Sequence, residues 1–151
     1  MEKKFPVPAL LKEISGYFRN AGFSAYLVGG AVRDFFLKKA ASDWDIATDA
    51  QPQEVMCLFR RTIPTGIEHG TVTIIYKSKH IECTTFRTEA DYTDGRHPAA
   101  VSYTATIEED LARRDFTMNA IAVSLPDGII ADPFNGCADI RAGRIRTVGN
   151  P

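Results

Sequence analysis

The sequence lacks a hydrophobic run that could cross a membrane, because no apolar stretch reaches the roughly 18 residues that a spanning helix needs. Its first residues, MEKKFPVPALLKE, lack the apolar core and small-residue cleavage site of a secretion signal. Internal repeats and low-complexity segments are also missing. These absences argue against membrane and repeat proteins, and we expect a cytoplasmic protein with no membrane partner.

Cysteine is scarce, and neither a C-x-x-C pair nor a histidine at zinc-ligand spacing accompanies Cys57, Cys83 and Cys137. We expect these thiols to be reduced and mostly buried, because free cysteine behaves as a small hydrophobic residue. A charge excess is also lacking, since the net charge is −1. Binding to nucleic acid would therefore depend on a local basic patch and not on the charge of the whole chain.

The composition is that of one globular domain, with 151 residues, 44% hydrophobic and 25% charged. Such a chain can bury a core without disulfides or a structural metal. The segment PALLKEISGYFRNAG repeats apolar residues at a helical period, and Gly22 is placed to end that helix. SAYLV then predicts a buried strand, and AVRDFFLKK predicts a second helix beyond Gly29 and Gly30.

The remaining segments predict a mixed sheet. We expect a strand at 43–47, a helix from Pro52 to about residue 60 capped by Asp49, and a hairpin of GTVTIIYK and HIECTTFR. Residues 88–102 are polar and rich in turn residues, which predicts a mobile loop near a site. Thr106 and Glu109 form a capping-box signal for a helix to about residue 113, and strand signals follow in DGIIADPFNG and RIRTVG. The expected fold class is α/β (α+β), with a small, mixed, largely antiparallel sheet flanked by helices.

Two aspartates in SDWDIATDA carry the first chemical signal. In a strand, Asp43 and Asp45 lie on the same side, while Trp44 and Ile46 face the core. Adjacent carboxylates repel each other, which raises one pKa unless a cation lies between them, and Mg²⁺ prefers oxygen ligands. Alone, the pair is more typical of a solvated strand end than of a metal site.

The Gly29-Gly30 pair, between a buried strand and a helix, changes that balance. Glycine lets the backbone approach a ligand closely, and the N–H groups at the start of a helix favour phosphate. A tight turn between two elements would explain the glycines equally well. Together, however, a phosphate cradle and paired carboxylates describe a site for a nucleoside triphosphate and its metal ions.

Several longer motifs resemble one family. YLVGGAVRDFFL, SDWDIATDA, GIEHGTVTIIYKSKHIECTTFR and DLARRDFTMNAIA occur in the order typical of one catalytic head domain. This order resembles the catalytic head domain of the class II tRNA nucleotidyltransferase (CCA-adding enzyme) and bacterial poly(A) polymerase family, within the DNA polymerase β superfamily. The resemblance runs from about Tyr26 to Val148 and implies that residues 1–151 form one such head domain, with the small polymerase-β-like sheet.

The resemblance implies roles for three acidic residues. Asp43 and Asp45 would be catalytic and would bind two Mg²⁺ ions, and Glu82 would be a third catalytic carboxylate; an outward-pointing hairpin residue is the alternative for Glu82. One ion would activate the RNA 3′-hydroxyl and the other would neutralise the leaving pyrophosphate. No covalent nucleophile is required, in agreement with the lack of a Ser-His or Cys-His motif. The histidines expected at the surface or in hydrogen bonds are His69, His80 and His97.

The resemblance also implies a nucleotide-binding set. Arg33, beside Asp34, would reach the triphosphate or pair with a carboxylate, and the R-R-D-x-x-x-N element would contact the sugar and phosphates. Planar guanidinium groups suit bidentate phosphate contacts. Arg87 would touch phosphate or gate the following loop. The expected nucleotide-binding residues are Gly29, Gly30, Arg33, Asp34, Arg87, Arg113, Arg114, Asp115 and Asn119.

GIEHGTVTIIYKSKHIECTTFR resembles the hairpin of CCA-adding enzymes, so the expected reaction transfers CMP and AMP from CTP and ATP to the 3′ end of tRNA. Poly(A) polymerases and enzymes that add only C or only A are the alternatives within the family. The chain stops at TVGNP, where family members continue into neck, body and tail domains, and the neck carries the E-D-x-x-R element that reads the base. We therefore expect this head to bind triphosphate without selecting the base, and to hold tRNA mainly through domains outside this chain.

Two other classes of function use similar residues. A module that binds nucleotide without transferring it would keep the same fold, but the retention of both aspartates, the glycine pair and Arg114 argues against it. A metal-dependent phosphohydrolase would also use carboxylates and Mg²⁺, but it would usually carry additional histidine or aspartate ligands.

Overall fold

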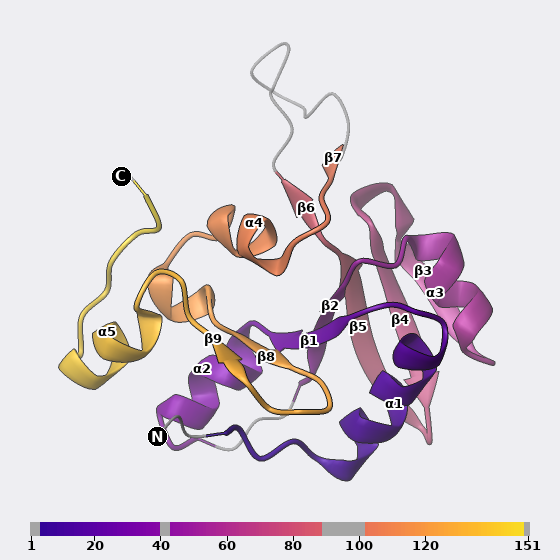
Figure 1. Cartoon of the computed structure of the whole chain (residues 1–151), viewed down its shortest axis with the longest axis horizontal. Helices are drawn as coiled ribbons and strands as arrows, with labels where there is room; N and C mark the ends of the chain where they lie inside the picture. The colour runs from indigo at the N-terminus through magenta and orange to yellow at the C-terminus, as the bar shows by residue number, and fades with distance from the viewer. Residues whose placement is uncertain (1–3, 40–42, 89–101, 150–151) are drawn as a thin grey trace.

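A seven-stranded sheet forms the centre of the computed structural model, which describes residues 4–39, 43–88 and 102–149 (Figure 1). Its strands lie in the order β3-β4-β5-β2-β1-β8-β9. Their bounds are β1 Ala25–Val28, β2 Asp45–Thr48, β3 Thr62–Gly66, β4 Thr71–Tyr76, β5 Lys79–Thr85, β8 Ala122–Ser124 and β9 Ile130–Ala131. A separate two-stranded ribbon consists of β6 (Arg87–Thr88) and β7 (Ser102–Tyr103).

The sheet is mixed and largely antiparallel, as expected from the sequence. Among the described strands, β2 and β5 form the one parallel pair, and all other neighbours run antiparallel. In the parallel pair Asp45 lies opposite Glu82, and across the next strand Glu82 lies opposite Thr73. Because residues in register point to the same face of a sheet, this pairing gathers polar side chains of three strands on one face.

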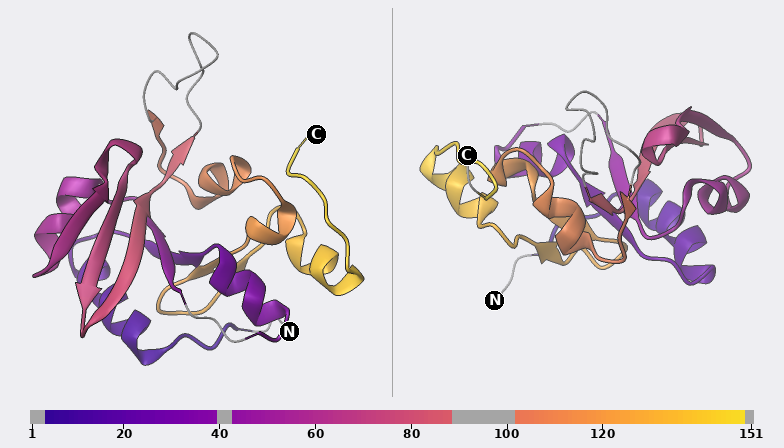
Figure 2. Two further views of the ribbon diagram at one scale, coloured as in Figure 1. Left: turned by 180° about the vertical axis from the view of Figure 1, so that it is seen from behind. Right: turned by 90° about the horizontal axis from the view of Figure 1, so that it is seen from above.

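In the described part of the chain, five helices and two short 3₁₀ turns surround the sheet. They are α1 Ala9–Asn20, α2 Gly30–Phe36, α3 Pro52–Leu58, α4 Ile107–Ala112 and α5 Gly136–Ala142, with η1 Ile67–His69 and η2 Thr117–Asn119. Helix α1 buries Leu11, Ile14 and Phe18, the stripe that its helical period predicted. Figures 1 and 2 place α3 and α5 at opposite ends of the molecule. No helix in the described ranges is long and apolar enough to cross a membrane.

Two hydrophobic clusters cover the two faces of the central strands. Leu27 of β1 and Ile46 of β2 belong to the larger cluster, which also contains the buried residues of α1. Their neighbours Val28 and Ala47 belong to the smaller one, whose other buried members are Phe86, Ile107, Leu111, Ala120 and Ala122. Neighbouring residues in a strand point to opposite faces, so β1 and β2 join both clusters.

The predicted start of α4 is confirmed, because Thr106 is the N-cap residue and its hydroxyl accepts the backbone N–H of Glu109 at 3.3 Å. The Glu109 side chain contacts that same hydroxyl, which donates to its carboxylate at 3.0 Å. The prediction that Asp49 caps α3 is wrong. Gln51 is the N-cap residue and forms a capping box with Glu54. Asp49 instead accepts the backbone N–H of Ser24 at 2.8 Å, and this tertiary contact ties the end of β2 to the start of β1.

Other local predictions differ in extent. Strand β2 begins at Asp45 and not at residue 43. RIRTVG forms no regular strand, and its one isolated bridge pairs Phe116 with Thr147. The predicted loop has its first residue in β6 and its last in β7, and residues 89–101 lie outside the described part of the chain. All three thiols are free, but Cys57 is exposed, contrary to the expectation of mostly buried cysteines.

Candidate active site

Two pockets that share Asp45 bring together the predicted site residues, apart from Asp34 and Arg87. The arginine pocket, of about 480 Å³, is lined by Gly29, Gly30, Arg33, Asp45, Arg113, Arg114, Asp115 and Asn119. The carboxylate pocket, of about 470 Å³, is lined by Asp43, Trp44, Asp45, Thr73, His80 and Glu82. The predicted residues therefore lie around one continuous region centred on Asp45, although they come from distant parts of the chain.

The carboxylate pocket concentrates negative charge around Asp45, the first residue of β2. Burial raises the pKa of Asp45 above its ordinary value, and the charges of Glu82 and Asp43 raise that pKa further, while Arg114 opposes them. Glu82 lies directly opposite Asp45 in the neighbouring strand and is exposed. A cation in this pocket would relieve the repulsion between the carboxylates.

The donor chemistry of this pocket fits Mg²⁺, because carboxylate oxygens are the ligands that hard divalent ions prefer. Within the described residues there is no group of three or more histidine, cysteine, aspartate or glutamate side chains that could hold a metal ion. Mg²⁺ commonly takes only one or two carboxylates from a protein and completes its coordination with waters and substrate phosphates. Asp43 and Asp45 line this pocket and could provide that smaller number of ligands.

Gly29 and Gly30 leave room for the side chains around the arginine pocket. Gly29 has φ +76° and ψ −147°, a conformation that is essentially restricted to glycine. A Cβ at this position would lie 3.2 Å from Oδ2 of Asp45, and a Cβ at Gly30 would lie 3.3 Å from Nη2 of Arg33. The structure therefore shows the turn between strand and helix, and the close approach to a phosphate stays a prediction.

A chain of hydrogen bonds crosses one side of the arginine pocket. Arg33 Nη1 donates to Oδ1 of Asn119 at 3.1 Å, and Asn119 Nδ2 donates to Oδ1 of Asp115 at 3.3 Å. The backbone N–H of Phe116 donates to the same Asp115 oxygen at 2.7 Å. This backbone hydrogen bond, followed by that of Asn119, lowers the pKa of Asp115, which is exposed and acts as an acceptor at the pocket edge.

The other side of the pocket is formed by two arginines that share one partner. Arg113 Nε and Arg114 Nη2 each lie 3.3 Å from a carboxylate oxygen of Asp110. Burial lowers the pKa of Arg114, and the charge of Asp110 is the largest influence that opposes this effect. The sequence reasoning missed Asp110, although its spacing of three and four residues from the arginines in DLARRD is that of helical ion pairs.

Asp34 and Arg87 line neither of these two pockets. Asp34 pairs with its neighbour Arg33, whose Nε lies 3.4 Å from Oδ1. Arg87 Nη1 donates to the backbone carbonyl oxygen of His69 at 2.6 Å, which links β6 to the end of η1. Both residues thus lie outside the lining of the two pockets, and each has a partner.

The histidines agree with their prediction as surface residues where the structure describes them. His69 is exposed beside Glu68, and His80 is exposed at the edge of the carboxylate pocket. His97 lies outside the described residues.

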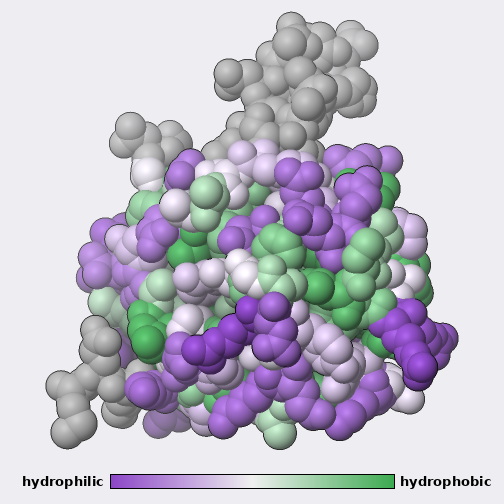
Figure 3. All heavy atoms as spheres, turned by 45° about the vertical axis from the view of Figure 1, so that its right-hand side comes forward, coloured by the Kyte–Doolittle hydropathy of each residue, from purple (hydrophilic) through white to green (hydrophobic). Residues whose placement is uncertain are grey.

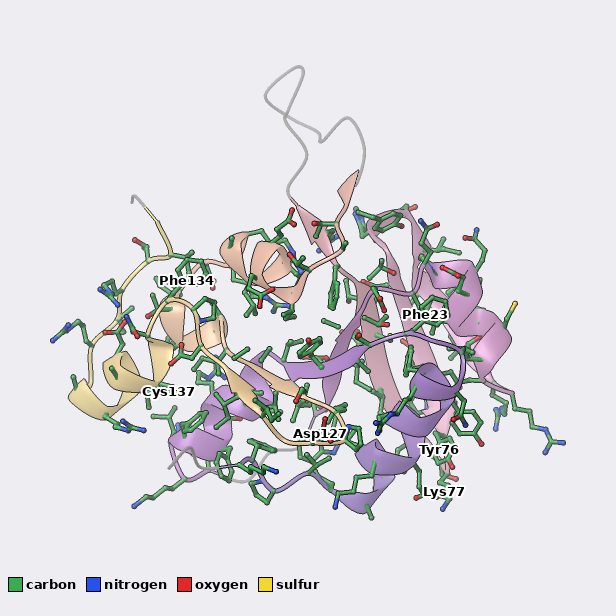
Figure 4. All side chains as sticks on the ribbon, in the orientation of Figure 1. Phe23, Tyr76, Lys77, Asp127, Phe134 and Cys137 are labelled. Atoms are coloured by element: carbon green, nitrogen blue, oxygen red, sulfur yellow. The ribbon has the colours of Figure 1, made fainter. Side chains whose placement is uncertain are left out.

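A larger cavity, of about 600 Å³, contains none of the predicted site residues. Its lining includes Tyr17, Phe59, Arg60, Tyr76 and Lys77. Figure 4 shows Tyr76 and Lys77 near the tip of the β4–β5 hairpin, away from α4. On the side of the molecule that Figure 3 brings forward, hydrophobic residues are interspersed with hydrophilic ones. The volume of a cavity is therefore a poor guide to the active site here, because this larger cavity lacks the acidic and arginine residues of the two smaller pockets.

Comparisons with known proteins point in one direction. The Poly A polymerase head domain family matches residues 25–146. The CCA-adding enzyme of Bacillus subtilis is 48% identical over 155 residues, which cover 100% of this chain and 37% of that protein. The CCA-adding enzyme of Leuconostoc citreum is 52% identical over 134 residues, which cover 89% of this chain and 33% of that protein. The chain thus spans about a third of the length of these curated relatives.

Solved structures give a similar result. The Bacillus stearothermophilus CCA-adding enzyme in complex with CTP has a TM-score of 0.83 and 45% identity, over 93% of this chain and 33% of that one. A tRNA nucleotidyltransferase complexed with a primer tRNA and an incoming ATP analog has a TM-score of 0.70 and 32% identity. That match covers 92% of this chain and 39% of the other.

Proposed function

This chain belongs to the Poly A polymerase head domain family, and we propose that within this family it is the catalytic head of a CCA-adding enzyme. The reaction is the transfer of CMP and AMP from CTP and ATP to the 3′ end of tRNA, with release of pyrophosphate. The observation that carries the proposal is the meeting of the carboxylate and arginine pockets at Asp45. The names of the relatives and structural neighbours support this reaction.

Asp43 and Asp45 would hold two Mg²⁺ ions, with Glu82 as a third catalytic carboxylate beside them. When bound, the ions lower the pKa of the attacking 3′-hydroxyl and neutralise charge on the triphosphate and leaving pyrophosphate. The chain places Glu82 opposite Asp45 through the β2–β5 register. Asp45 is half-buried and lines both pockets, so a metal ion held there would lie beside the arginine pocket.

The arginine pocket would bind the triphosphate and the sugar. Arg33, Arg113 and Arg114 bring three guanidinium groups to its lining, and Gly29 leaves space for the phosphates beside Asp45. Asp115 offers a carboxylate oxygen that can accept a hydrogen bond from a ribose hydroxyl. These residues would align the α-phosphate for attack, so that catalysis comes mainly from positioning and charge stabilisation.

This head would bind the triphosphate without selecting the base. The lining of the arginine pocket is dominated by groups that suit phosphate and sugar. We therefore expect CTP, ATP, GTP and UTP to bind the isolated chain with similar affinity in the presence of Mg²⁺. Isothermal titration with each nucleotide checks this, and strong selectivity for CTP and ATP would contradict it.

The deciding experiment uses the full-length protein that contains this chain. Given tRNA without its 3′ end, labelled CTP, ATP and Mg²⁺, it should add C, C and A and release pyrophosphate, whereas long runs of A would identify a poly(A) polymerase. Asp45→Asn should abolish the addition. Asp127→Asn is the control, because Asp127 is exposed and lines neither pocket. It lies in the turn between β8 and β9 (Figure 4). Near-normal addition by Asp45→Asn would contradict the metal-ligand assignment.

A further inference from the structure

Asp110 is almost completely buried, with 1% of its surface exposed. It lies on α4, where the adjacent acidic residues Glu108 and Glu109 are exposed. A buried carboxylate is unfavourable unless charged or polar partners compensate for its lost hydration. The burial of Asp110 therefore needs an explanation, whereas the exposed positions of Glu108 and Glu109 do not.

Three hydrogen-bond donors compensate for the lost hydration of the Asp110 carboxylate. One precedes α4 in the chain and two follow it. Oδ1 of Asp110 accepts the backbone N–H of Arg87 at 3.0 Å and Nε of Arg113 at 3.3 Å. Oδ2 accepts Nη2 of Arg114, also at 3.3 Å. Both carboxylate oxygens are thus engaged, and two of the three donors belong to arginines of the arginine pocket.

Asp110 restricts the orientation of the two guanidinium groups, although it is not itself part of the pocket lining. Their side chains are only 16% and 18% exposed, and both line the pocket. Each guanidinium carries five N–H groups, of which the contact with Asp110 uses one. Nε of Arg114 is buried and has no partner among the residues that the structure describes. That buried nitrogen is closed to a ligand, but both arginines line the pocket, and Asp110 restricts their orientation while further N–H groups on each can serve a ligand.

We propose that Asp110 is a positioning residue of the nucleotidyl transfer reaction, which holds Arg113 and Arg114 so that their remaining donors face the triphosphate of the incoming nucleotide. The proposal rests on the proposed function, since it takes the arginine pocket to be the triphosphate site. Asp110 itself lines neither the arginine nor the carboxylate pocket. It acts through the arginines and does not touch the reacting groups.

Asp139 provides a matched control elsewhere in the chain. It is 2% exposed, accepts the Thr117 hydroxyl at 2.6 Å and Nε of Arg146 at 3.0 Å, and also pairs with Arg144. It thus resembles Asp110 in residue type, burial and arginine partners, but it lines neither pocket. A purely structural role would make the two aspartates equivalent in their effect on catalysis.

The test compares Asp110→Asn and Asp139→Asn in the full-length protein. Both variants should lower Tm, because each leaves arginines without their carboxylate. Asp110→Asn alone should raise KM for CTP and ATP about tenfold or more, as expected for a lost charged contact to phosphate, with KM for tRNA unchanged. Equal nucleotide KM values in the two variants would overturn the proposal.

Two further measurements keep the proposal testable. If Asp110→Asn does not fold, Asp110→Glu keeps the charge but displaces both guanidinium groups, so a nucleotide KM equal to that of the wild type would overturn it. If the wild-type protein transfers no nucleotide, the proposed function fails, but the positioning role is still measurable. The Nε–H NMR signals of Arg113 and Arg114 should then shift and broaden in Asp110→Asn or Asp110→Glu and not in Asp139→Asn, and unchanged signals would reject it.

Discussion

A Cβ atom at Gly29 would lie 3.2 Å from Oδ2 of Asp45. This distance is shorter than most contacts of real Cβ atoms, and the backbone at Gly29 has a positive φ of +76°. A side chain there would strain the turn and press on the carboxylate at the junction of the two pockets. The glycine thus protects the position of a proposed metal ligand that follows it in the neighbouring strand.

Gly29→Ala should therefore weaken both stability and function. We expect a loss of about 1–3 kcal/mol in the free energy of unfolding, because a non-glycine residue must adopt a rarely populated conformation. Binding of Mg²⁺ with CTP should weaken as well. Urea unfolding and calorimetric titration measure the two effects. Gly16→Ala is the control, since a Cβ at Gly16 in α1 meets no atom within 4 Å and should stabilise the helix by about 0.5–1 kcal/mol.

Gly136→Ala should be more damaging than Gly29→Ala for folding. A Cβ at Gly136, the first residue of α5, would clash with the backbone oxygen of Thr117 in η2. Backbone atoms cannot move aside as a flexible side chain can, so we expect a loss of about 3 kcal/mol or more. Gly143→Ala, at φ +66° in open space, should cost only about 1 kcal/mol. Thermal unfolding of the two variants checks the order, and equal Tm values would contradict it.

The stability of the fold should decrease in acid through Asp139. The Thr117 hydroxyl, followed by Arg146, lowers the pKa of Asp139 below its ordinary value of 3.8. Because the folded state favours the ionised form, this group stabilises the protein above that value and loses its contribution as pH falls through the lowered pKa. The difference in unfolding free energy between wild type and Asp139→Asn should be larger at about pH 6 than at about pH 3. A difference that stays constant with pH would contradict this assignment.

The three cysteines should differ sharply in reactivity. Cys57 is exposed at the surface of α3. Burial raises the pKa of Cys83 far above the ordinary thiol value, and burial with the nearby Asp132 raises the pKa of Cys137 to about 12. Since the thiolate is the reactive form, a disulfide reagent at neutral pH should label only Cys57 in the folded protein. Cys57→Ser should then eliminate labelling, and rapid labelling of Cys137 in that variant would contradict the prediction.

The sequence predicted best those features that depend on neighbours along the chain. The strand, glycine-pair and helix arrangement at Gly29-Gly30 and the N-cap at Thr106 follow from local periodicity and turn chemistry, and both are present. The capping role of Asp49 failed because a distant donor, the Ser24 N–H, competes for its carboxylate. A local pattern cannot reveal such competition.

The site itself was predictable only in part. The spacing of Asp43 and Asp45 alone favoured a solvated strand end, and only the Gly29-Gly30 pair and the family motifs indicated a site. The place of Glu82 depends on the register between β2 and β5. The contact of Arg33 with Asn119 joins residues 86 positions apart, which no periodicity specifies. Family resemblance supplied these residues, and it did not supply Asp110, whose importance becomes visible only through its burial.

The parallel pairing of β2 with β5 also has a consequence for the order of folding. The β4–β5 hairpin joins strands that are adjacent in sequence and can form early, but a parallel pair needs a long crossover, here through α3, β3 and β4. Asp45 and Glu82 therefore come together only after that crossover has closed. A partly folded chain can therefore contain the β4–β5 hairpin before Asp45 and Glu82 are neighbours. The repulsion between these two carboxylates then destabilises the chain only after the sheet around them has formed.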